Sequence, residues 1–413
     1  MQLGKKFNYG YIIVFSCFIM SFIYLGLGNI TQNLYVVPVT EYFGFARSEY
    51  SFIFSIIAIV GIVANLSYDK IYKSMGIRFM VGSGTLLFAA GYFIYYKASS
   101  LPAFYLGASF LGIGLVYTST LTFSMLINSW FTENKGLILG LIFAGSGLGG
   151  AVFSPVVAKI ITNYGYNRSY LIGSIIFLIL SIPVTLMVKE PTVPITDMEI
   201  SKSDNILTTK KTTGELLKEP CIIAALFCLF MFGFLIAPFL HITPAHMTDR
   251  NFDYIFASEV SGVIMLILAF AKVFLGVVND RFNIKVSMSI GLITFIISSI
   301  LLFFMTNKLI AWLYAISYGF ALATLSVLIP LFVLAVSGEE YFSNLIGISV
   351  SLMSAGAAAG TPAMSLSYDF TGSYDLVLIV FAVLGTITYV ITMKTIKKSS
   401  ELINNSSLVL SED

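Results

Sequence analysis

Long apolar runs separated by short polar segments make up most of the chain. A helix that crosses a lipid bilayer needs about 20 apolar residues in succession, and twelve runs approach or exceed that length. They cover residues 9–37, 50–68, 79–96, 102–128, 136–162, 169–188, 220–246, 255–278, 286–305, 309–336, 345–367 and 376–393. The pattern therefore predicts an all-α membrane protein with twelve transmembrane helices.

One long hydrophilic segment, residues 190–219, separates the first six runs from the last six. It is too short for a soluble catalytic domain, and its polar composition is typical of a disordered linker with one surface-lying helical turn. We therefore expect two pseudo-symmetric six-helix bundles joined by a cytoplasmic linker and followed by a cytoplasmic tail. Their predicted bounds are 1–189 for the first bundle, 190–219 for the linker, 220–394 for the second bundle and 395–413 for the tail.

The composition indicates a surface that faces lipid. Hydrophobic residues make up 57% of the 413 residues and charged residues only 11%, whereas soluble domains carry roughly 25% charged residues. The net charge of +2 gives no indication of a nucleic-acid partner. The three cysteines lie inside apolar runs, and neither histidine has a Cys or acidic cluster nearby in sequence. We therefore expect no disulfide, no metal site and no cofactor.

Most Lys and Arg residues lie in loops on the same side as the N-terminus. These loops hold Lys5, Lys6, Lys70, Lys73, Arg78, Lys135, Lys189, Lys202, Lys210, Lys211, Lys218, Arg281, Lys285, Lys394, Lys397 and Lys398. The opposite loops hold Arg47, Lys97, Arg168, Arg250 and Lys308. Because cytoplasmic loops are enriched in positive charge, this asymmetry predicts a multi-pass cell-membrane protein with both termini in the cytoplasm.

The two halves of the chain resemble each other at a shift of 211 residues, which places Asp69 on Asp280. The same register matches glycines of the fifth and eleventh runs, namely Gly145 and Gly149 with Gly356 and Gly360. Small residues four apart allow close helix packing, so these glycines are candidate packing positions. Two similar bundles could also rock against each other around a site near mid-membrane, and the same glycines would serve either purpose.

The loop after the eighth run carries the sequence Gly276-Val-Val-Asn-Asp280-Arg281-Phe-Asn-Ile-Lys285. It resembles the signature loop of the major facilitator superfamily, and the first-half copy around Asp69 is degraded, with Asn where the Gly is expected. The resemblance implies a conformational switch on the cytoplasmic side formed by Asp69, Gly276, Asp280, Arg281 and Lys285. A carboxylate beside a helix N-terminus and an arginine is stabilised in one arrangement and released in the other.

A narrower resemblance is to the monocarboxylate transporters and the related oxalate/formate antiporters. Four stretches carry it, at residues 45–48, 130–155, 238–244 and 369–374. In the monocarboxylate transporters an arginine four residues before the loop glycine holds the substrate carboxylate, and Lys272 occupies that place here. The eleventh run lacks the second cation of the oxalate transporters, which favours a substrate with one carboxylate.

The position of Lys272 makes it a candidate functional residue independently of the resemblance. A cation at mid-membrane costs about 2.5–3.5 kcal/mol on insertion scales, so such a charge is expected to serve a function. The alternative is that its side chain snorkels to the nearer membrane surface. Helical side chains lean toward their own N-terminus, and the eighth run starts on the outer side, so the amine should point to the membrane centre. Anion binding is the favoured interpretation.

Other candidates for substrate contact are polar residues in apolar runs. Asn29 and Asn33 would line a cavity or bond between helices. His241, between Pro238 and Pro244 where we expect a broken helix, would gate, carry a proton or fill a packing role. Tyr117 and Tyr318 are further candidates for contact with the substrate.

Taken together, these features predict a secondary transporter of a small, lactate-like or pyruvate-like organic anion, working by alternating access. Proton symport and anion exchange both remain open, so protons are a candidate partner. One alternative is a facilitator-type exporter of drug-like molecules, although such cation exporters usually need a membrane-embedded carboxylate. Another is a transporter-like sensor without flux. An enzyme is not expected, because no nucleophile–base pair, metal cluster or phosphate loop is present.

Overall fold

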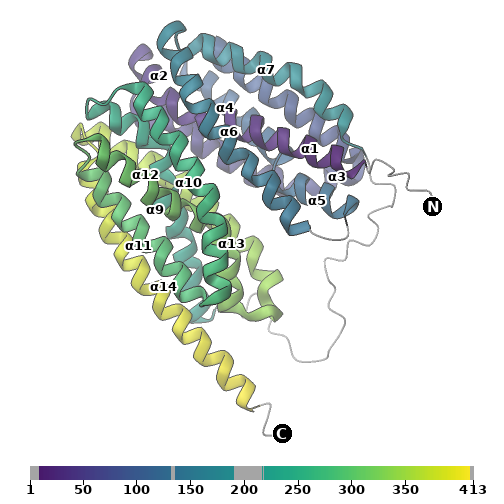
Figure 1. Cartoon of the computed structure of the whole chain (residues 1–413), viewed down its shortest axis with the longest axis vertical. Helices are drawn as coiled ribbons and strands as arrows, with labels where there is room; N and C mark the ends of the chain where they lie inside the picture. Colours follow the sequence, from purple (N-terminus) through teal and green to yellow (C-terminus); the bar gives the residue numbers. More distant parts are fainter. Residues whose placement is uncertain (1–8, 132–134, 190–215, 217, 410–413) are drawn as a thin grey trace, which may run out of the picture. The chain divides into compact units, whose positions relative to one another are not determined.

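The structure is a computed structural model that describes residues 9–131, 135–189, 216 and 218–409 (Figure 1). Within these residues all regular structure is helical, and twelve segments are long and apolar enough to cross a membrane. In lipid, the backbone N–H and C=O groups must be satisfied within the protein, which a helix does by itself. The predicted all-α fold of twelve membrane-spanning helices is confirmed.

The chain divides into two compact units, and the first consists of residues 1–38 and 60–206. Its helices are α1 (Gly10–Ile19), the π-helix η1 (Met20–Leu27), the 3-10 helix η2 (Ile30–Tyr35), the greater part of α3 (Arg47–Lys97), α4 (Leu101–Tyr117), α5 (Thr120–Trp130), α6 (Lys135–Tyr164) and α7 (Tyr166–Met187).

The second unit consists of residues 39–59 and 207–413, so it includes the start of α3. Its helices are the end of α2 (Val36–Phe43), residues 47–59 of α3, α9 (Pro220–Asp249), α10 (Tyr254–Arg281), α11 (Ile284–Phe303), α12 (Lys308–Ala323), the π-helix η4 (Thr324–Leu328), α13 (Ile329–Thr371) and α14 (Asp375–Val409). Nearly all of the linker predicted at 190–219 lies outside the described residues. The segment predicted as a tail from residue 395 continues α14 as far as Val409.

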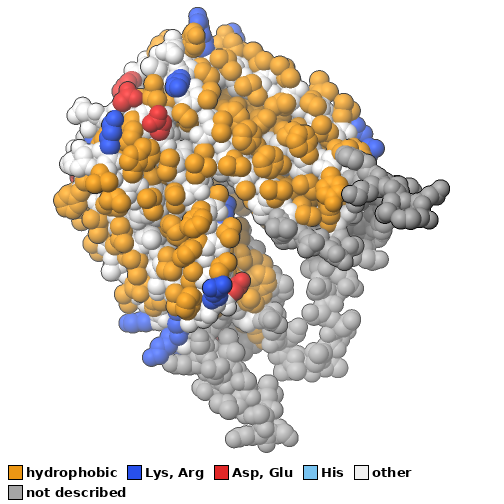
Figure 2. Space-filling view, viewed as in Figure 1, with side chains coloured by type: hydrophobic (Ala, Val, Ile, Leu, Met, Phe, Trp, Pro, Cys, Tyr) orange, Lys and Arg blue, Asp and Glu red, His pale blue; other side chains and the backbone are white. Residues whose placement is uncertain are grey.

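The surface carries large apolar side chains in the numbers that a lipid environment requires. Leu66 is 83% exposed, Val273 69% and Ile182 65%. Figure 2 shows one face of the molecule on which such side chains predominate and Lys, Arg, Asp and Glu are sparse. A soluble protein rarely exposes contiguous apolar surface of this kind, so the protein is a multi-pass membrane protein.

In the first unit, glycines of α6 allow close contact with the first helices of the chain. A Cβ at Gly145 would lie 3.1 Å from the carbonyl oxygen of Phe18, and one at Gly149 would lie 2.0 Å from that of Phe22. The rings of Phe18 and Phe22 stack with centroids 6.2 Å apart. At Gly149 only glycine permits this approach of one backbone to another, and at Gly145 a Cβ would make a tight contact.

The second unit repeats this arrangement between α13 and α9. A Cβ at Gly356 would lie 2.1 Å from the carbonyl oxygen of Phe230, and one at Gly360 would lie 2.2 Å from that of Phe234. The two phenylalanine rings again stack, with centroids 6.0 Å apart. The internal repeat seen in the sequence therefore corresponds to one packing motif used twice.

The repeat also extends to the turns that follow these helices. Gly165 ends α6 with φ +85°, and Gly372 ends α13 with φ +71°. Both values lie in the left-handed region that side-chain-bearing residues rarely adopt. Glycine is therefore needed at the same place in each half.

The Gly356→Ala substitution tests the packing of α13 on α9. We expect a loss of about 1–3 kcal/mol, the usual range for overpacking, because the new methyl group meets backbone that cannot give way. Gly347→Ala in the same helix is the matched control, since a Cβ there meets nothing within 4 Å. Thermal unfolding in detergent should show a lower midpoint for Gly356→Ala alone; equal midpoints for the two variants would contradict the packing.

Candidate functional site

Lys272 lies in α10 on the side that faces away from lipid. At 100° per residue, the exposed residues Phe270, Val273 and Val277 lie about 100–160° around the helix from Lys272. Their exposed fractions are 59%, 69% and 46%, whereas Lys272 is half-buried. Ser261, within about 20° of the direction of Lys272, is only 1% exposed. A lysine that snorkelled along the lipid surface would lie on the opposite face.

The burial of this face of α10 decreases along the helix. It is buried near the Asp253 end, where Met265 is 1% exposed, and half-buried from Leu268 through Lys272 and Gly276 toward the Arg281 end. The Lys272 side chain therefore lies where a closed helix face becomes an accessible one. Such a position suits a group that meets a small molecule entering the protein.

The Lys272 ammonium is not neutralised within the part of the chain that the structure describes. It makes no hydrogen bond and no ion pair there, and Asp280, two turns further along α10, is exposed and likewise makes neither. Because the Lys272 amine has no hydrogen-bond acceptor and no carboxylate partner among the described residues, its three donors are available to an anion.

His241 is half-buried in α9 and stacks on Phe54 of α3, with ring centroids 3.8 Å apart and planes 24° apart. The expectation of a broken helix around it is wrong, because α9 runs without interruption through Pro238 and Pro244. The Tyr318 hydroxyl donates to the carbonyl of Ile236 at 2.8 Å.

The other residues predicted to contact the substrate differ in how far their side chains are buried. Tyr318 is fully buried, so its hydroxyl supports α9. In the first unit, Asn33 is 1% exposed and Tyr117 7%, the latter within a cluster that includes Tyr68. Asn29 is half-buried, at the irregular turn between η1 and η2. Lys272, His241 and Asn29 thus remain the accessible candidates, and no hydrogen bond joins them among the described residues.

The residues of the predicted switch lie at the junction of α10 and α11. Gly276 has open space around its Cα, and Asp280 and Arg281 are exposed, while Lys285 is half-buried. The Asp69 side chain lies outside the described residues. The role of these residues as a switch therefore stays a prediction.

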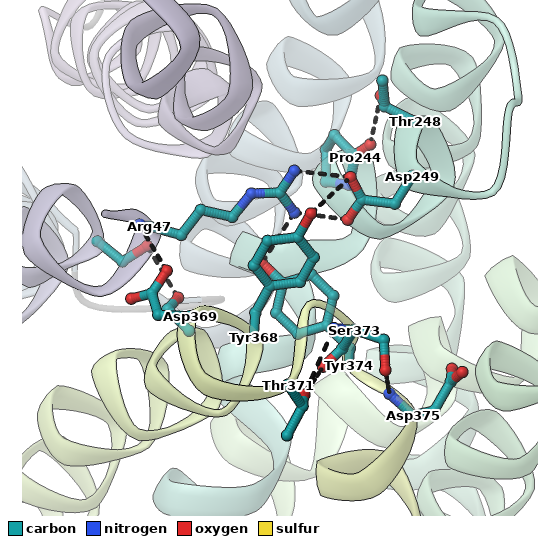
Figure 3. A network of polar contacts seen from close by, with 12 residues as sticks. Arg47, Pro244, Thr248, Asp249, Tyr368, Asp369, Thr371, Ser373, Tyr374 and Asp375 are labelled. Carbon is teal, nitrogen blue, oxygen red and sulfur yellow. Dashed lines mark hydrogen bonds and ion pairs between the residues drawn. The ribbon is translucent and has the colours of Figure 1, made fainter. Parts of the chain in front are cut away.

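A polar network that the sequence analysis did not identify lies at the start of α3 (Figure 3). The carboxylate of Asp369, on α13, accepts hydrogen bonds from the backbone N–H groups of Arg47 and Ser48, both at 2.9 Å. These are among the N–H groups that a helix N-terminus leaves without an internal partner. A residue of a distant helix thus caps α3, and its negative charge suits the positive end of the helix dipole.

The Arg47 side chain binds Asp249 at the end of α9. Its Nη1 and Nη2 atoms donate to the two carboxylate oxygens at 2.5 and 2.6 Å, which is the bidentate geometry of strong ion pairs. The guanidinium also lies 3.8 Å from the ring centre of Tyr368 and donates to the Tyr374 hydroxyl at 3.3 Å. Burial raises the pKa of Tyr374, so this hydroxyl stays neutral at physiological pH.

Two sequence signals could have revealed this network. Residues 45–48 and 369–374 were two of the four stretches behind the narrower resemblance, and the structure brings them together. The sequence contained no indication of a partner for Arg47 within the second stretch or elsewhere. Its side chain, at 10% exposure, shows that it belongs to a buried ion pair.

Twelve membrane-length helices among the described residues and two halves with repeated packing are typical of a membrane transporter. Residues 16–361 match the Major Facilitator Superfamily. The chain belongs to this family.

The solved structures agree on the fold. The nucleoside transporter NupG (D323A mutant) has a TM-score of 0.76 to this chain at 14% sequence identity, and the alignment covers 94% of this chain and 100% of the other. At this identity the likeness shows the shared fold alone.

Sequence relatives include carriers of small carboxylates. Monocarboxylate transporter 13 of Rattus norvegicus is 24% identical over 90% of this chain and 86% of its own length. Monocarboxylate transporter 9 of Pongo abelii is 29% identical over 42% of this chain, and the Oxalate:formate antiporter of Oxalobacter formigenes 24% over 46%. The matched region spans only 34% and 44% of the length of these last two proteins.

The Asp249→Asn substitution tests the contribution of the Arg47 pair to stability. It leaves a buried guanidinium with a neutral partner, and we expect a loss of about 1–3 kcal/mol, since the side chains retain some solvent contact. Asp375→Asn is the matched control, because the Arg250–Asp375 pair joins the residue that follows α9 to the start of α14, with side chains 31% and 40% exposed. Thermal unfolding should rank Asp249→Asn as the less stable; the reverse order would show that burial does not decide the effect.

Proposed function

We propose that the protein carries a small organic monocarboxylate across the cell membrane by alternating access, with both termini in the cytoplasm. Lys272 provides the central support. It is a cation in a transmembrane helix, turned away from lipid, half-buried, and without a hydrogen bond or ion pair among the described residues. Intramembrane ionisable residues that face the protein interior commonly mark substrate pathways.

The physical role of Lys272 is to neutralise the carboxylate of the substrate. Moving a carboxylate into a low-dielectric region is costly unless a positive charge receives it. A lysine supplies a point charge with rotatable donors, whereas an arginine would hold a carboxylate through two parallel hydrogen bonds. Lys272 therefore suits anions whose carboxylates arrive in more than one orientation.

The charge of the substrate is inferred from the absence of a second cation in the eleventh span. The eleventh span, Leu345–Thr371, contains no Lys or Arg. One cation is matched to one carboxylate, which favours lactate-like and pyruvate-like anions over dicarboxylates. The names of the relatives, monocarboxylate transporters and an antiporter of oxalate and formate, support the same substrate class.

Alternating access requires two parts that each move as a body. The glycine contacts of α6 with α1 and η1, and of α13 with α9, make two rigid pairs related by the internal repeat. The loop from Gly276 to Lys285, together with Asp69, would set the balance between the two conformations. His241, half-buried on α9, and Lys272 are the candidates for proton coupling, and exchange of one anion for another is the other mode of coupling.

Uptake of labelled lactate, pyruvate, formate and oxalate into proteoliposomes tests this proposal. We expect uptake of at least one monocarboxylate and loss of about tenfold or more in the Lys272→Gln variant, because an unpaired carboxylate is costly to bury. Lys272→Arg should retain measurable uptake. Lys308→Gln is the matched control and should transport normally. It removes a cation at the start of α12 that lies over the ring of Phe256 in α10.

The remaining outcomes separate the alternatives. Normal uptake by Lys272→Gln would overturn the assigned role of the lysine, and counterflow of ethidium-like cations without carboxylate uptake would favour a drug exporter. Binding of carboxylates without flux would favour a sensor. Repeating the uptake with and without a pH gradient distinguishes proton symport from anion exchange.

A further inference from the structure

We propose that the lipid-facing side of α11 and α12 carries a binding groove for a phospholipid with an anionic headgroup. The phosphate of this lipid meets Lys285, and an acyl chain follows α11 into the membrane. All residues of the groove belong to the second unit. The proposal depends on neither the transported substrate nor the mode of coupling.

Two adjoining depressions of the surface form this groove. The first has a volume of about 410 Å³ and is lined by Lys285, Val286, Ser289, Ile290, Ile293 and Thr294 of α11. The second, of about 480 Å³, is lined by residues of both α11 and α12. Ile290 and Thr294 line both depressions, so the two join. We call the joined depressions the α11 groove.

The α11 groove faces the acyl chains of the bilayer. Val286, Ile293 and Ile297 are exposed, and at 100° per residue they lie within about 40° of one another around α11. Leu313 and Ile316 of α12 line the second depression and are exposed as well. A contiguous surface of exposed apolar side chains on a membrane protein is a surface in contact with lipid.

The first depression has the length of one leaflet of the bilayer. The 20 residues of α11 measure about 30 Å, which is the thickness of the hydrocarbon core. Lys285, in the first turn, therefore lies at the level of the lipid headgroups. Thr294 lies about 14 Å further along the helix, close to the middle of the membrane. A lipid of this leaflet can thus place its phosphate at one end of the depression and its acyl chain along the rest.

The last turns of α14 lie beside the Lys285 end of the groove. The two helices pack together (Figure 1). The Ser299 hydroxyl donates to the carbonyl of Leu378 at 2.8 Å, and the Ser289 hydroxyl lies 3.4 Å from that of Tyr389. As the residue number falls along α11 it rises along α14, so the helices are antiparallel. The first turn of α11 is therefore level with the turn of α14 that follows Tyr389.

This turn of α14 adds positive charge beside Lys285. It carries Lys394 and Lys397, both exposed, and Lys285 makes no hydrogen bond and no ion pair among the described residues. The segment Ile284–Phe303 contains no Asp or Glu. The carboxylate nearest along the chain is the exposed Asp280, and Arg281 follows it directly. The described charges at this end of the groove are therefore positive in sum, which favours an anionic headgroup.

The headgroup, and not the acyl chain, makes the site selective. Bilayer hydrocarbon is as apolar as the groove, so an acyl chain that enters the groove gains only van der Waals contact. The lysines, in contrast, attract a negatively charged headgroup more strongly than a zwitterionic one. A phospholipid uses both the charge and the apolar groove, whereas a sterol has no negative charge for Lys285. The Lys285 end lies on the side that we propose to be cytoplasmic, where anionic lipids are enriched.

Native mass spectrometry of the full-length protein in detergent tests the role of the charge. It compares the affinities for phosphatidylglycerol and phosphatidylcholine with identical acyl chains. We expect about tenfold tighter binding of phosphatidylglycerol, and Lys285→Gln should reduce this preference about fivefold, equivalent to about 1 kcal/mol for one lysine. Lys73→Gln is the matched control, because it removes an exposed lysine of the first unit. This variant should keep the preference of the parent.

A pair of tryptophan variants tests the role of the groove. Ile293 lines the first depression, whereas Ile300, on the same side of α11, lines neither depression. Their exposed fractions are similar, at 42% and 46%. Ile293→Trp should weaken binding of phosphatidylglycerol by about fivefold or more, because the added bulk overfills the groove. Ile300→Trp should bind it as the parent does.

Three results would overturn the site, given that gel filtration shows each variant to be monodisperse. The first is equal affinity of the parent for the two lipids. The second is an equal loss of preference in Lys285→Gln and Lys73→Gln, which would indicate attraction to the net charge alone. The third is equal binding by the two tryptophan variants. Because no flux is measured, failure of the lipid site and failure of monocarboxylate transport are distinguishable.

Discussion

Hydrocarbon offers no hydrogen bonds, and the structure depends throughout on that constraint. Backbone groups are satisfied inside helices, and where a helix departs from regularity a side chain takes over. The Tyr92 hydroxyl lies within hydrogen-bond distance of the carbonyls of Leu27 and Gly28 at the irregular end of η1. The Tyr318 hydroxyl adds a hydrogen bond to the carbonyl of Ile236 in the uninterrupted helix α9. Lys272 is a cation that makes no hydrogen bond within the described residues. In such an environment this is unusual, and it makes Lys272 a candidate for binding a ligand.

The two halves of the chain meet the same constraint with the same packing. Glycines four apart on α6 and on α13 each receive the carbonyls of two stacked phenylalanines. Helices in lipid gain little from burying apolar side chains against one another, so close backbone contact supplies the attraction. A pair packed in this way moves as one body, and two such pairs related by an internal repeat suit a carrier with two alternating conformations.

Two positive charges illustrate how environment assigns a role. Arg47 is bound by Asp249, lies over Tyr368 and begins a helix capped by Asp369, so its charge is used inside the protein. Lys272 has no such partner among the described residues and lies where the face of α10 becomes accessible. The first arrangement holds segments of the chain together, and the second leaves a charge available to an anion. We propose that the same electrostatic attraction serves structure at Arg47 and substrate recognition at Lys272.

The amino-acid sequence by itself determined the twelve spans, the internal repeat and the position of Lys272, because hydropathy, glycine spacing and a charge in an apolar run are local properties. It did not determine that α9 continues through Pro238 and Pro244, since whether a helix tolerates an internal proline depends on its surroundings in the folded protein. Nor did it reveal the pairing of Arg47 with Asp249, which joins residues about 200 positions apart. Which side chains meet across helices, and which stay accessible, is decided by packing in three dimensions, and only the tertiary structure contains that information.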